Sequence, residues 1–423
     1  MPTHRSLFEK MRIAYFTSQF PTLSEGFVIN QIVGAIKAGH EVDIFTRNPH
    51  AGPPWSNLVE EYKLLEYTHI IRARTSHIEK LTKFLGKKVA RRLIHLHCIL
   101  NSKKRYSTRT DTHLNNKHYD IIHAQFGNLG NYVLELRNAG IIEGPILTAF
   151  RGIDITHRIK ERGDQEYKEL FKQAECMLPS CNYFKEILLS LGCPEKKIHV
   201  LYSGIDCARF RYYQRDFKNG PLRLLSLSRL VEKKGISTTL HALAKVRDQG
   251  IEFHYTIAGD GQELMTLQQL VKRLKLSSNV EFTGAVANES VVKLYDAHHI
   301  FLCTSITPST GDQDGAANSP KEAAATGMPL IITKHGGLPE VMLEGKSGWC
   351  INEGDSEGLA KQITQMHSKR NQLEQWSLLG AEFIRQNFDI TALNQQMLRI
   401  YKYEQNWDAS STEKNNRSKH YKI

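Results

Sequence analysis

The sequence predicts an α/β protein with two doubly wound parallel-sheet domains that face each other across a cleft. Short apolar runs alternate with amphipathic helical segments along most of the chain, and the alternation restarts after Asn219-Gly-Pro, where the local character changes. The length of 423 residues also favours two domains of roughly 200 residues each over a single core.

The first series predicts a sheet within residues 1–210. A buried strand follows Met11, a helix is expected from Gly26 to Ala38, and a second strand spans residues 41–46. Such a strand-helix-strand unit favours parallel pairing. Further strands of this sheet are expected at residues 121–124, 146–150, 176–179 and 199–201.

The second series predicts another sheet within residues 211–387. Its expected strands are 222–228, 253–258, 279–282, 300–303 and 330–333, and its expected helices are 235–248, 262–275, 289–296, 319–327, 357–366 and 373–386. The last apolar segment, about 388–405, is expected to rejoin the first domain. The polar tail 406–423 is expected to be disordered.

The composition is that of a soluble globular protein, with 40% hydrophobic and 24% charged residues. No apolar run approaches the roughly 18 residues that span a bilayer, and residues 1–10 lack the apolar middle of a signal peptide. A cytoplasmic protein is therefore expected. The seven cysteines form no Cys-x-x-Cys pair, which signals neither a zinc site nor a disulfide framework.

The net charge of +12 is concentrated in one segment. Between Arg72 and Arg109 there are twelve Lys and Arg residues and one acid, Glu79. Apolar residues interleave with these cations over 79–105, so this stretch can form an amphipathic helix on an anionic bilayer, where each cation contributes on the order of 1 kcal/mol. We expect peripheral attachment to the inner face of the cytoplasmic membrane. A solvated face is the plainer alternative, and nucleic acid is not expected because no recognition motif accompanies the charge.

The loops after two predicted strands of the second domain carry motifs that can bind an anion. Arg229 and Lys234 follow the strand 222–228, where two fixed cations would stabilise the negative charge that builds on a departing nucleoside diphosphate. Gly259-Asp-Gly261 follows the next strand, and its glycines permit a tight turn and the close approach of a nucleotide. Taken alone, the first motif is also typical of a solvated basic loop and the second of a plain turn.

Two carboxylates flank a helix start in the stretch from Asp314 to Glu322. Asn318-Ser319-Pro320 begins the helix, and Glu322 lies in its first turns, where a carboxylate can accept both hydroxyls of a ribose. Asp314 lies in the preceding Gly-rich loop and can face a transferred group, a role that Asp312 could also take. The plainer alternative is that Glu322 only favours the helix N-terminus.

The turn Gly336-Gly337-Leu338-Pro339-Glu340 predicts a second anion site. Pro near a helix start, preceded by Gly, leaves backbone amides unpaired at the sheet edge. Those amides and the helix dipole would attract a phosphate.

Together these motifs resemble the C-terminal half of retaining GT-B glycosyltransferases of family 4. The resemblance covers most of residues 222–365, and it extends more loosely to the N-terminal half through Phe20-Pro-x-x-Ser24-Glu25-x-Phe27, His123-Ala-Gln-Phe-Gly127 and Tyr202-Ser-Gly204-Ile-Asp206. Within the family, the chain looks most like bacterial enzymes that assemble exopolysaccharide or colanic-acid-type repeat units on a lipid carrier.

The resemblance implies the retaining transfer of a sugar from a nucleotide sugar, UDP- or GDP-linked, to a lipid-linked saccharide acceptor. The N-terminal domain would bind the acceptor and the C-terminal domain the donor. Glu322 would hold the ribose, Arg229 and Lys234 the diphosphate, and the amides of Gly336, Gly337 and Leu338 a phosphate. The other expected donor contacts are Gly259, Gly261, Asn318, Ser319 and Glu340. No cofactor or metal ion is expected, because cations and amides replace it.

Two positions depart from the family pattern. Asp314 stands where the family usually has Glu, and Arg151 stands where members commonly have a His that contacts the donor sugar. Arg151 could pair with a carboxylate or phosphate of the donor, or it could mark weakened activity. His123 is the other candidate catalytic group of the N-terminal wall, and the alternative is a structural role, which is more common for a lone His at a strand end. The alternatives are therefore a non-catalytic sugar-nucleotide or glycan-binding homologue, an epimerase or phosphorylase of the same architecture, and, less favoured, a hydrolase.

Overall fold

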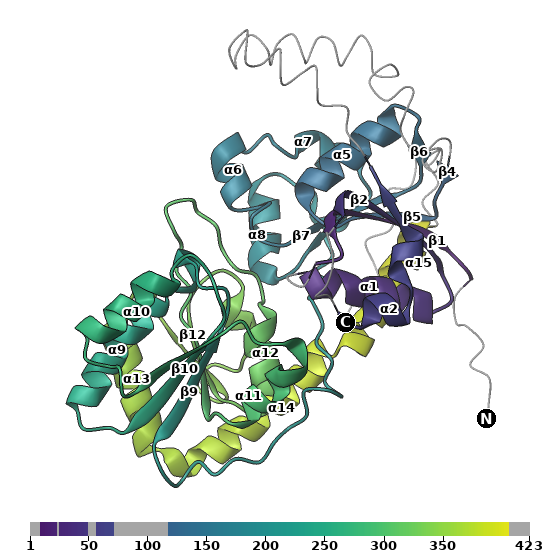
Figure 1. Ribbon diagram of the computed structural model, residues 1–423. Helices are drawn as coiled ribbons and strands as arrows, with labels where there is room; N and C mark the ends of the chain where they lie inside the picture. The colour runs from purple at the N-terminus through teal and green to yellow at the C-terminus, as the bar shows by residue number, and fades with distance from the viewer. Residues whose placement is uncertain (1–8, 23–24, 50–55, 72–116, 406–423) are drawn as a thin grey trace, which may run out of the picture.

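The computed structural model describes residues 9–22, 25–49, 56–71 and 117–405. They form two α/β domains, each with a six-stranded sheet flanked by helices (Figure 1). The predicted fold class is thus confirmed. The basic segment 79–105 and the tail 406–423 lie outside the described residues, so the expectations for them stay predictions. None of the helices in these ranges combines the length and the hydropathy needed to cross a membrane.

The first sheet has the strand order β3-β2-β1-β5-β7-β8, and its pairings are parallel. The strands β5, β7 and β8 are buried along their whole length, as expected for strands covered on both faces. The strands are β1 (Arg12–Phe20), β2 (Glu41–Pro49), β3 (Thr68–Ile70), β5 (Ile121–Ala124), β7 (Ile146–Phe150) and β8 (Cys176–Pro179). A separate ribbon pairs β4 (Lys117–His118) with β6 (Ile142–Glu143). The helices are α1 (Gly26–Lys37), α2 (Leu58–Glu61), α5 (Gly127–Asn138), α6 (His157–Arg162), α7 (Lys168–Gln173) and α8 (Asn182–Ser190), with 3-10 turns at η2 (Leu64–Tyr67) and η3 (Glu195–Lys197).

The strand predicted at residues 199–201 is wrong. The chain bridges β8 at Ile198, and His199 N and Leu201 N donate to the carbonyls of Met177 and Pro179 at 3.0 and 2.9 Å, but no regular strand forms. The carbonyl of Val200 instead accepts a hydrogen bond from the Gln396 side chain at 3.2 Å. This segment is therefore shared between β8 and the last helix, and it leaves the sheet edge toward the second domain.

The second sheet has the order β11-β10-β9-β12-β13-β14, again with parallel pairings. Its strands are β9 (Leu222–Leu227), β10 (Phe253–Ala258), β11 (Val280–Gly284), β12 (Ile300–Cys303), β13 (Leu330–Thr333) and β14 (Gly348–Ile351). Its helices are α9 (Ile236–Asp248), α10 (Leu264–Arg273), α11 (Val291–Asp296), α12 (Asn318–Ala325) and α13 (Ser356–Ser368), with 3-10 turns at η4 (Glu232–Lys234), η5 (Asn288–Ser290), η6 (Leu338–Val341) and η7 (Arg370–Gln372). The edge strand β14 was not predicted, because Gly348-Trp-Cys-Ile is short and begins with Gly.

The last two helices connect the domains. The helix α14 (Leu373–Phe388) packs on α12, and α15 (Ile390–Gln405) returns to pack on α1, as the yellow end of the chain in Figure 1 shows. The chain passes between the domains twice, near Ile205 and near Phe388, and these two segments are hydrogen-bonded to each other. Ile205 N donates to Phe388 O, and Ile390 N donates to Ile205 O, both at 2.9 Å. Gly204 permits this approach, because a Cβ there would lie 2.6 Å from the Ile390 Cα.

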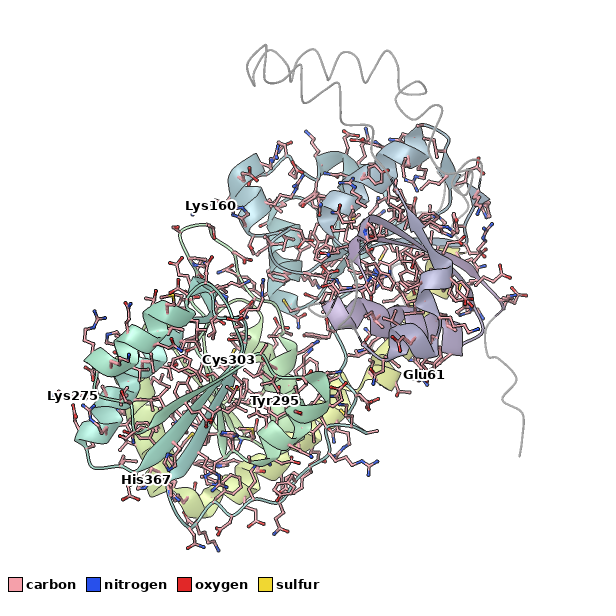
Figure 2. All side chains as sticks on the ribbon, in the orientation of Figure 1. Glu61, Lys160, Lys275, Tyr295, Cys303 and His367 are labelled. Atoms are coloured by element: carbon pink, nitrogen blue, oxygen red, sulfur yellow. The ribbon has the colours of Figure 1, made fainter. Side chains whose placement is uncertain are left out.

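The strand order of each sheet reverses at its centre, between β1 and β5 in the first sheet and between β9 and β12 in the second. Ligands of open α/β sheets bind beyond the carboxyl ends of the strands at such points. Loops beyond these ends also join the domains. Lys160 of α6 reaches the other domain, where its Nζ donates to the Ser309 carbonyl at 2.6 Å (Figure 2).

Candidate active site

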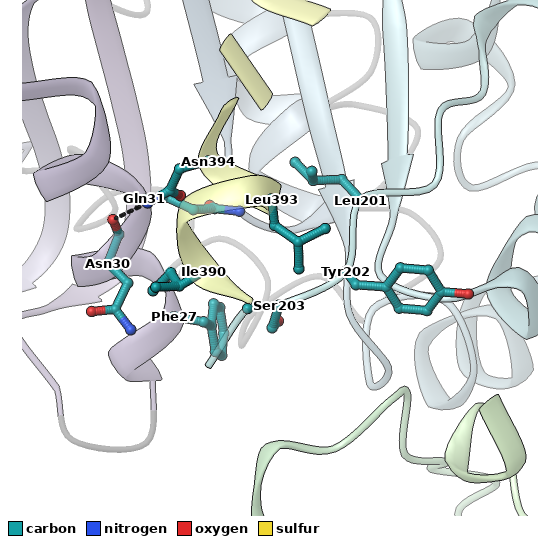
Figure 3. A pocket seen from close by; sticks show the side chains of 10 residues that line it. Phe27, Asn30, Gln31, Leu201, Tyr202, Ser203, Ile390, Leu393 and Asn394 are labelled. Carbon is teal, nitrogen blue, oxygen red and sulfur yellow. Dashed lines mark hydrogen bonds between the residues drawn. The ribbon is translucent and has the colours of Figure 1, made fainter. Parts of the chain in front are cut away.

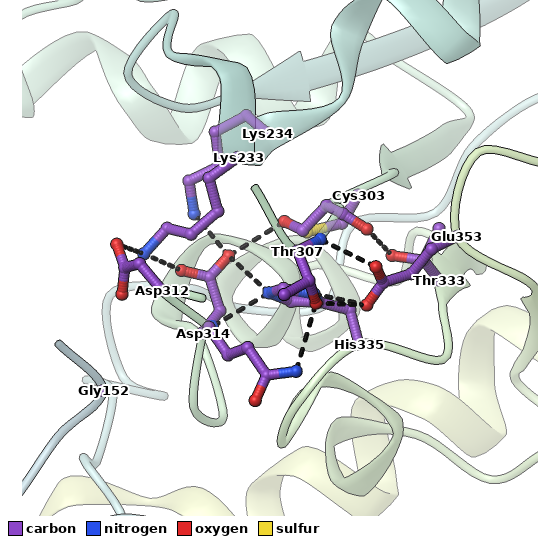
Figure 4. Close-up of polar contacts among 12 residues, drawn as sticks. Gly152, Lys233, Lys234, Cys303, Thr307, Asp312, Asp314, Thr333, His335 and Glu353 are labelled. Carbon is purple, nitrogen blue, oxygen red and sulfur yellow. Dashed lines mark hydrogen bonds and ion pairs between the residues drawn. The ribbon is translucent and has the colours of Figure 1, made fainter. Parts of the chain in front are cut away.

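Asp314 is the centre of a charged cluster beyond the carboxyl ends of β9 and β12 (Figure 4). Its carboxylate accepts a hydrogen bond from Lys234 Nζ at 2.8 Å and one from Ser305 Oγ at 2.8 Å, and it pairs with Lys233 Nζ at 3.1 Å. Burial alone would raise the pKa of Asp314, but the ammonium groups of Lys234 and Lys233 outweigh it and hold that pKa well below its usual value. Asp314 therefore remains ionised. Asp312, the alternative carboxylate, contacts only Lys233 of this pair, at 2.7 Å.

A histidine and a glutamate fix the backbone of Asp314. Asp314 N donates to His335 Nε2 at 2.9 Å, so the other ring nitrogen, Nδ1, carries the proton and donates to Glu353 Oε1 at 2.7 Å. The same carboxylate accepts from Thr307 N at 2.7 Å. Burial opposes ionisation of Glu353, but these hydrogen bonds prevail and lower its pKa. The loop that carries Asp314 is thus tied at both ends.

Arg229 lies exposed on the loop after β9, and its side chain makes no hydrogen bond or ion pair within the described residues. The neighbouring glycines explain where this loop sits. Gly259 and Gly261 have positive φ, and a Cβ on either would collide with the carbonyls of Ser228 and Leu230. The two glycines therefore pack the turn after β10 against the Arg229 loop. This packing positions the loop that carries Arg229, and a contact of the two glycines with the donor stays a prediction.

Glu322 lies on α12, which begins at Asn318, one residue earlier than expected. Its Oε2 accepts a hydrogen bond from the OH of Tyr295 at 2.9 Å, and the same OH lies 3.3 Å from the carbonyl of Ser319. Burial raises the pKa of Glu322, and the bond from Tyr295 works against that rise. The carboxylate is thus held in one orientation beside the start of the helix.

Comparisons with known proteins show the family of this chain. Residues 25–209 match the family described as Glycosyltransferase Family 4, and residues 213–381 match Glycosyl transferases group 1. A Salmonella typhimurium protein named as a colanic acid biosynthesis glycosyltransferase, WcaL, is 32% identical over 411 residues, which is 92% of this chain and 99% of the relative. This chain belongs to glycosyltransferase family 4. The amylovoran biosynthesis glycosyltransferase AmsK of Erwinia amylovora is 31% identical over 83% of this chain and 89% of its own length.

Similarity to solved structures shows that this glycosyltransferase has the GT-B fold. The crystal structure of Anabaena HepE in complex with UDP has a TM-score of 0.70 at 18% identity, covering 93% of this chain and 100% of that one. A sucrose-phosphate synthase from Thermosynechococcus elongatus has a TM-score of 0.69 at 18% identity, covering 93% and 99%. The resemblance drawn from the motifs is therefore confirmed.

The anion site predicted at residues 336–338 of this glycosyltransferase is not formed as expected. Gly337 N donates to Asp314 O and Leu338 N donates to His335 O, both at 3.0 Å. Of the three amides, Gly336 N alone lacks a hydrogen bond to another described residue. The following helix is a single 3-10 turn, η6, whose dipole is correspondingly small. The prediction of three unpaired amides is wrong because the turn uses two of them to hold the loops of Asp314 and His335.

Glu340 was also predicted to contact the donor, but in the structure its carboxylate binds groups of the first domain. Its carboxylate accepts from the backbone amides of Asn182 and Tyr183 at 2.9 and 2.8 Å, and from the OH of Tyr202 at 2.6 Å. The unpaired amides at the start of α8 attract the carboxylate. Glu340 therefore links the second domain of the family 4 enzyme to the first.

His123 is a core residue, so the prediction that it is catalytic is wrong. Its side chain is fully buried on β5, and its Nδ1 lies 2.5 Å from the OH of Tyr401 on α15. Burial lowers the pKa of His123 to about 3, with the charge of Arg151 acting in the same direction. The returning helix α15 covers this position, a contact that residues so far apart in sequence do not reveal.

Several residues of the site were not predicted, and they fall into two groups. Lys233 and His335 adjoin predicted residues, and their position beside those motifs was the available signal. Ser305, Glu353 and Tyr295 join the site only through the fold and carry no local motif. Lys321 was not predicted to be buried. It lies fully buried on α12 and donates to the Ser203 carbonyl, where the chain passes between the domains.

One group of described residues has donor atoms placed to hold a metal ion. Cys176, His199 and Glu404 each offer an atom within 4.8 Å of the others. Cys176 begins β8, so the group lies at the opposite end of the first sheet from the loops that carry Arg151 and meet Asp314. It has no part in the proposed transfer.

Proposed function

We propose that this protein moves a sugar from a UDP- or GDP-linked donor to a lipid-linked saccharide acceptor in exopolysaccharide biosynthesis, with retention of configuration. The relatives WcaL and AmsK are named for the biosynthesis of colanic acid and amylovoran, and the similar fold of HepE was solved with UDP. The first domain, residues 1–210 with the return helix of about 388–405, would bind the acceptor. The second, residues 211–387, would bind the donor.

The observation that carries this proposal is the set of three cations at the switch point of the second sheet. Lys233 and Lys234 are oriented by Asp314, and Arg229 is exposed beside them. Breaking the bond between sugar and diphosphate builds negative charge on the distal phosphate, and pre-positioned cations stabilise that charge without reorganisation. The proposal assigns this task to Arg229 and Lys234 rather than to a metal ion.

Glu322 completes the donor site in this proposal. Tyr295 occupies one carboxylate oxygen, and the second is directed to the ribose hydroxyls. Asp314 holds its lysines in place and faces the transferred sugar. Asn318 and Ser319, in the first turn of α12, and Gly336 N, in the turn that packs on the Asp314 backbone, would supply further contacts to the donor.

The test is a transfer assay with the full chain, a bacterial membrane lipid fraction and radiolabelled nucleotide sugars. Wild type is expected to produce labelled lipid-linked saccharide with the anomeric configuration of the donor, and Glu322→Ala is expected to abolish it. Binding of nucleotide sugar without any turnover would instead indicate a non-catalytic homologue. Inversion of the configuration would contradict the retaining mechanism.

The basic segment 79–105 is proposed to hold the enzyme at the membrane where its acceptor is found. Co-sedimentation with vesicles that contain an anionic phospholipid should exceed that with purely zwitterionic vesicles and should fall with added salt. Equal binding to both kinds of vesicle would contradict this attachment.

A further inference from the structure

Arg151 lies at the switch point of the first sheet, opposite the donor site. It follows β7 directly, and its Nε and Nη2 donate to the carbonyl and side-chain oxygens of Gln125, at 3.2 and 2.6 Å. Nη2 also lies 3.2 Å from Gln31 Oε1, and the guanidinium stacks on the ring of Phe27 at 4.2 Å. The cation is thus held on three sides by groups of the first domain.

The hydrogen-bond acceptors of the Arg151 guanidinium are neutral, and the carboxylates of Asp154 and Glu25 act on its charge only from a longer distance. No carboxylate of the described residues lies within ion-pair distance of it, and Nη1 makes no hydrogen bond within that part of the chain. The carboxylate of Glu25 lies nearby, and burial raises the pKa of Glu25 to about 7 despite the charge of Arg151. A second buried cation, Lys321, adds to the positive potential. Holding a desolvated cation without a carboxylate in direct contact is costly, and an anionic ligand would lower that cost.

The position of Arg151 limits which part of a substrate can reach it. A Cβ on the next residue, Gly152, would lie 2.8 Å from the carbonyl of Gln313, whose neighbour is Asp314. On its other side, Phe27 and Gln31 line a hollow together with Ser203 at the domain crossing (Figure 3). The diphosphate is assigned to the cations of the second domain. Arg151 would therefore meet the sugars.

We propose that Arg151 binds a carboxylate on a sugar, so that the enzyme acts on a uronic acid. This rests on the proposed sugar transfer. The free N–H groups of Nη1 can donate charge-assisted hydrogen bonds to a carboxylate, and the neutral hydroxymethyl group of a hexose cannot reproduce that attraction. The carboxylate belongs to the transferred sugar or to the acceptor, and the two sources are separated by experiment.

The test compares UDP-glucuronate and UDP-galacturonate with UDP-glucose and UDP-galactose, by calorimetry and in the transfer assay. If the donor carries the carboxylate, wild type should prefer a uronate, and Arg151→Gln should lower kcat/KM for it by about ten- to a hundredfold while changing the neutral donor less than about threefold. Arg151→Lys, which keeps the charge but loses hydrogen bonds to Gln125 that orient the side chain, should lie between. If the acceptor carries it, the same loss should appear as an increase in KM for carboxylate-bearing saccharide lipids and not for their carboxyl-reduced forms.

Arg12→Gln is the matched control. Arg12 also stacks on an aromatic ring, that of Tyr119 at 4.8 Å, but it begins β1 at the far end of the same sheet. The Arg12→Gln variant should keep the preference of wild type between uronate and neutral substrates. Sugar transfer in which wild type and Arg151→Gln show the same kcat/KM for uronate donors and the same KM for carboxylate-bearing acceptors would overturn this inference and leave the proposed function standing. Absence of transfer from every nucleotide sugar would overturn the proposed function itself.

Discussion

Replacing the buried Lys321 with Met should stabilise the protein near neutral pH. Lys321 is fully buried, donates to the Ser203 carbonyl, and has its Nζ 5.3 Å from the centre of the Phe388 ring. Burial lowers the pKa of Lys321 to about 7 from an ordinary value of 10.5, although Glu322 acts against this. The unfolded chain therefore binds this proton more tightly than the folded chain does.

The size of the effect follows from these two pKa values. At about 1.4 kcal/mol per pH unit, the lysine destabilises the fold by roughly 5 kcal/mol at and below pH 7. Between pH 7 and 10.5 the folded state binds fewer protons than the unfolded state, so the stability of wild type rises with pH in this window. By pH 9 the penalty should have fallen to roughly 2 kcal/mol. Losing the hydrogen bond to Ser203 offsets about 1–3 kcal/mol of the gain in the Met variant.

Urea unfolding at pH 6, 7, 8 and 9 measures this difference. Two of the four tryptophans, Trp349 and Trp376, have rings 4.3 Å apart in the second domain, so part of the tryptophan fluorescence reports on the domain that contains α12. The advantage of Lys321→Met over wild type should shrink by roughly 2–3 kcal/mol from pH 7 to pH 9. Lys245→Met, at a lysine that pairs with Glu357 on the surface, is the control and should show no such trend. A difference between Lys321→Met and wild type that stays constant from pH 6 to 9 would refute the reasoning.

Three further substitutions probe the site. Lys234→Ala removes a cation from the leaving group, so kcat/KM for transfer should fall more than about a hundredfold with unchanged circular dichroism; a rate near that of wild type would remove Lys234 from the mechanism. Tyr295→Phe frees Glu322 to rotate and should weaken binding of the nucleotide sugar by about three- to tenfold in calorimetry. An affinity equal to that of wild type would contradict this role of Tyr295. Glu340→Gln should lower the free energy of unfolding by about 1 kcal/mol, because it weakens the cap of α8, and unchanged urea midpoints would argue against that contact.

Much of the fold could be predicted from local sequence. The strands β7 and β8 have the bounds expected for them, because strands buried on both faces appear as continuous apolar runs. The strand expected at 199–201 does not form although two of its amides donate to β8, because the Val200 carbonyl accepts from Gln396 of the last helix, a contact that the local sequence does not reveal. The strand β14 was missed for the opposite reason, since its partner β13 supplies the pairing that its own short sequence does not suggest.

The site was predictable where motif residues meet and unpredictable where their partners are distant. Asp314 and Lys234 were placed in one site and do contact each other. Glu340 was assigned to the donor, but its partner Asn182 lies 158 positions away, so its use as a cap could not be anticipated. The same holds for His123, whose partner Tyr401 is 278 positions distant. Local spacing identifies the side chains near a strand end, and only the fold shows which of them are already engaged.

Calorimetric titration of UDP, GDP and ADP into the full chain tests most directly whether the cations of the second domain receive a nucleoside diphosphate. One of these nucleotides should bind at one site per chain, more weakly as salt rises, and an Arg229→Ala, Lys234→Ala double variant should lose at least about a hundredfold in affinity while Lys245→Ala loses none. Absence of binding by all three nucleotides, or binding that the double variant retains in full, would contradict the proposed site.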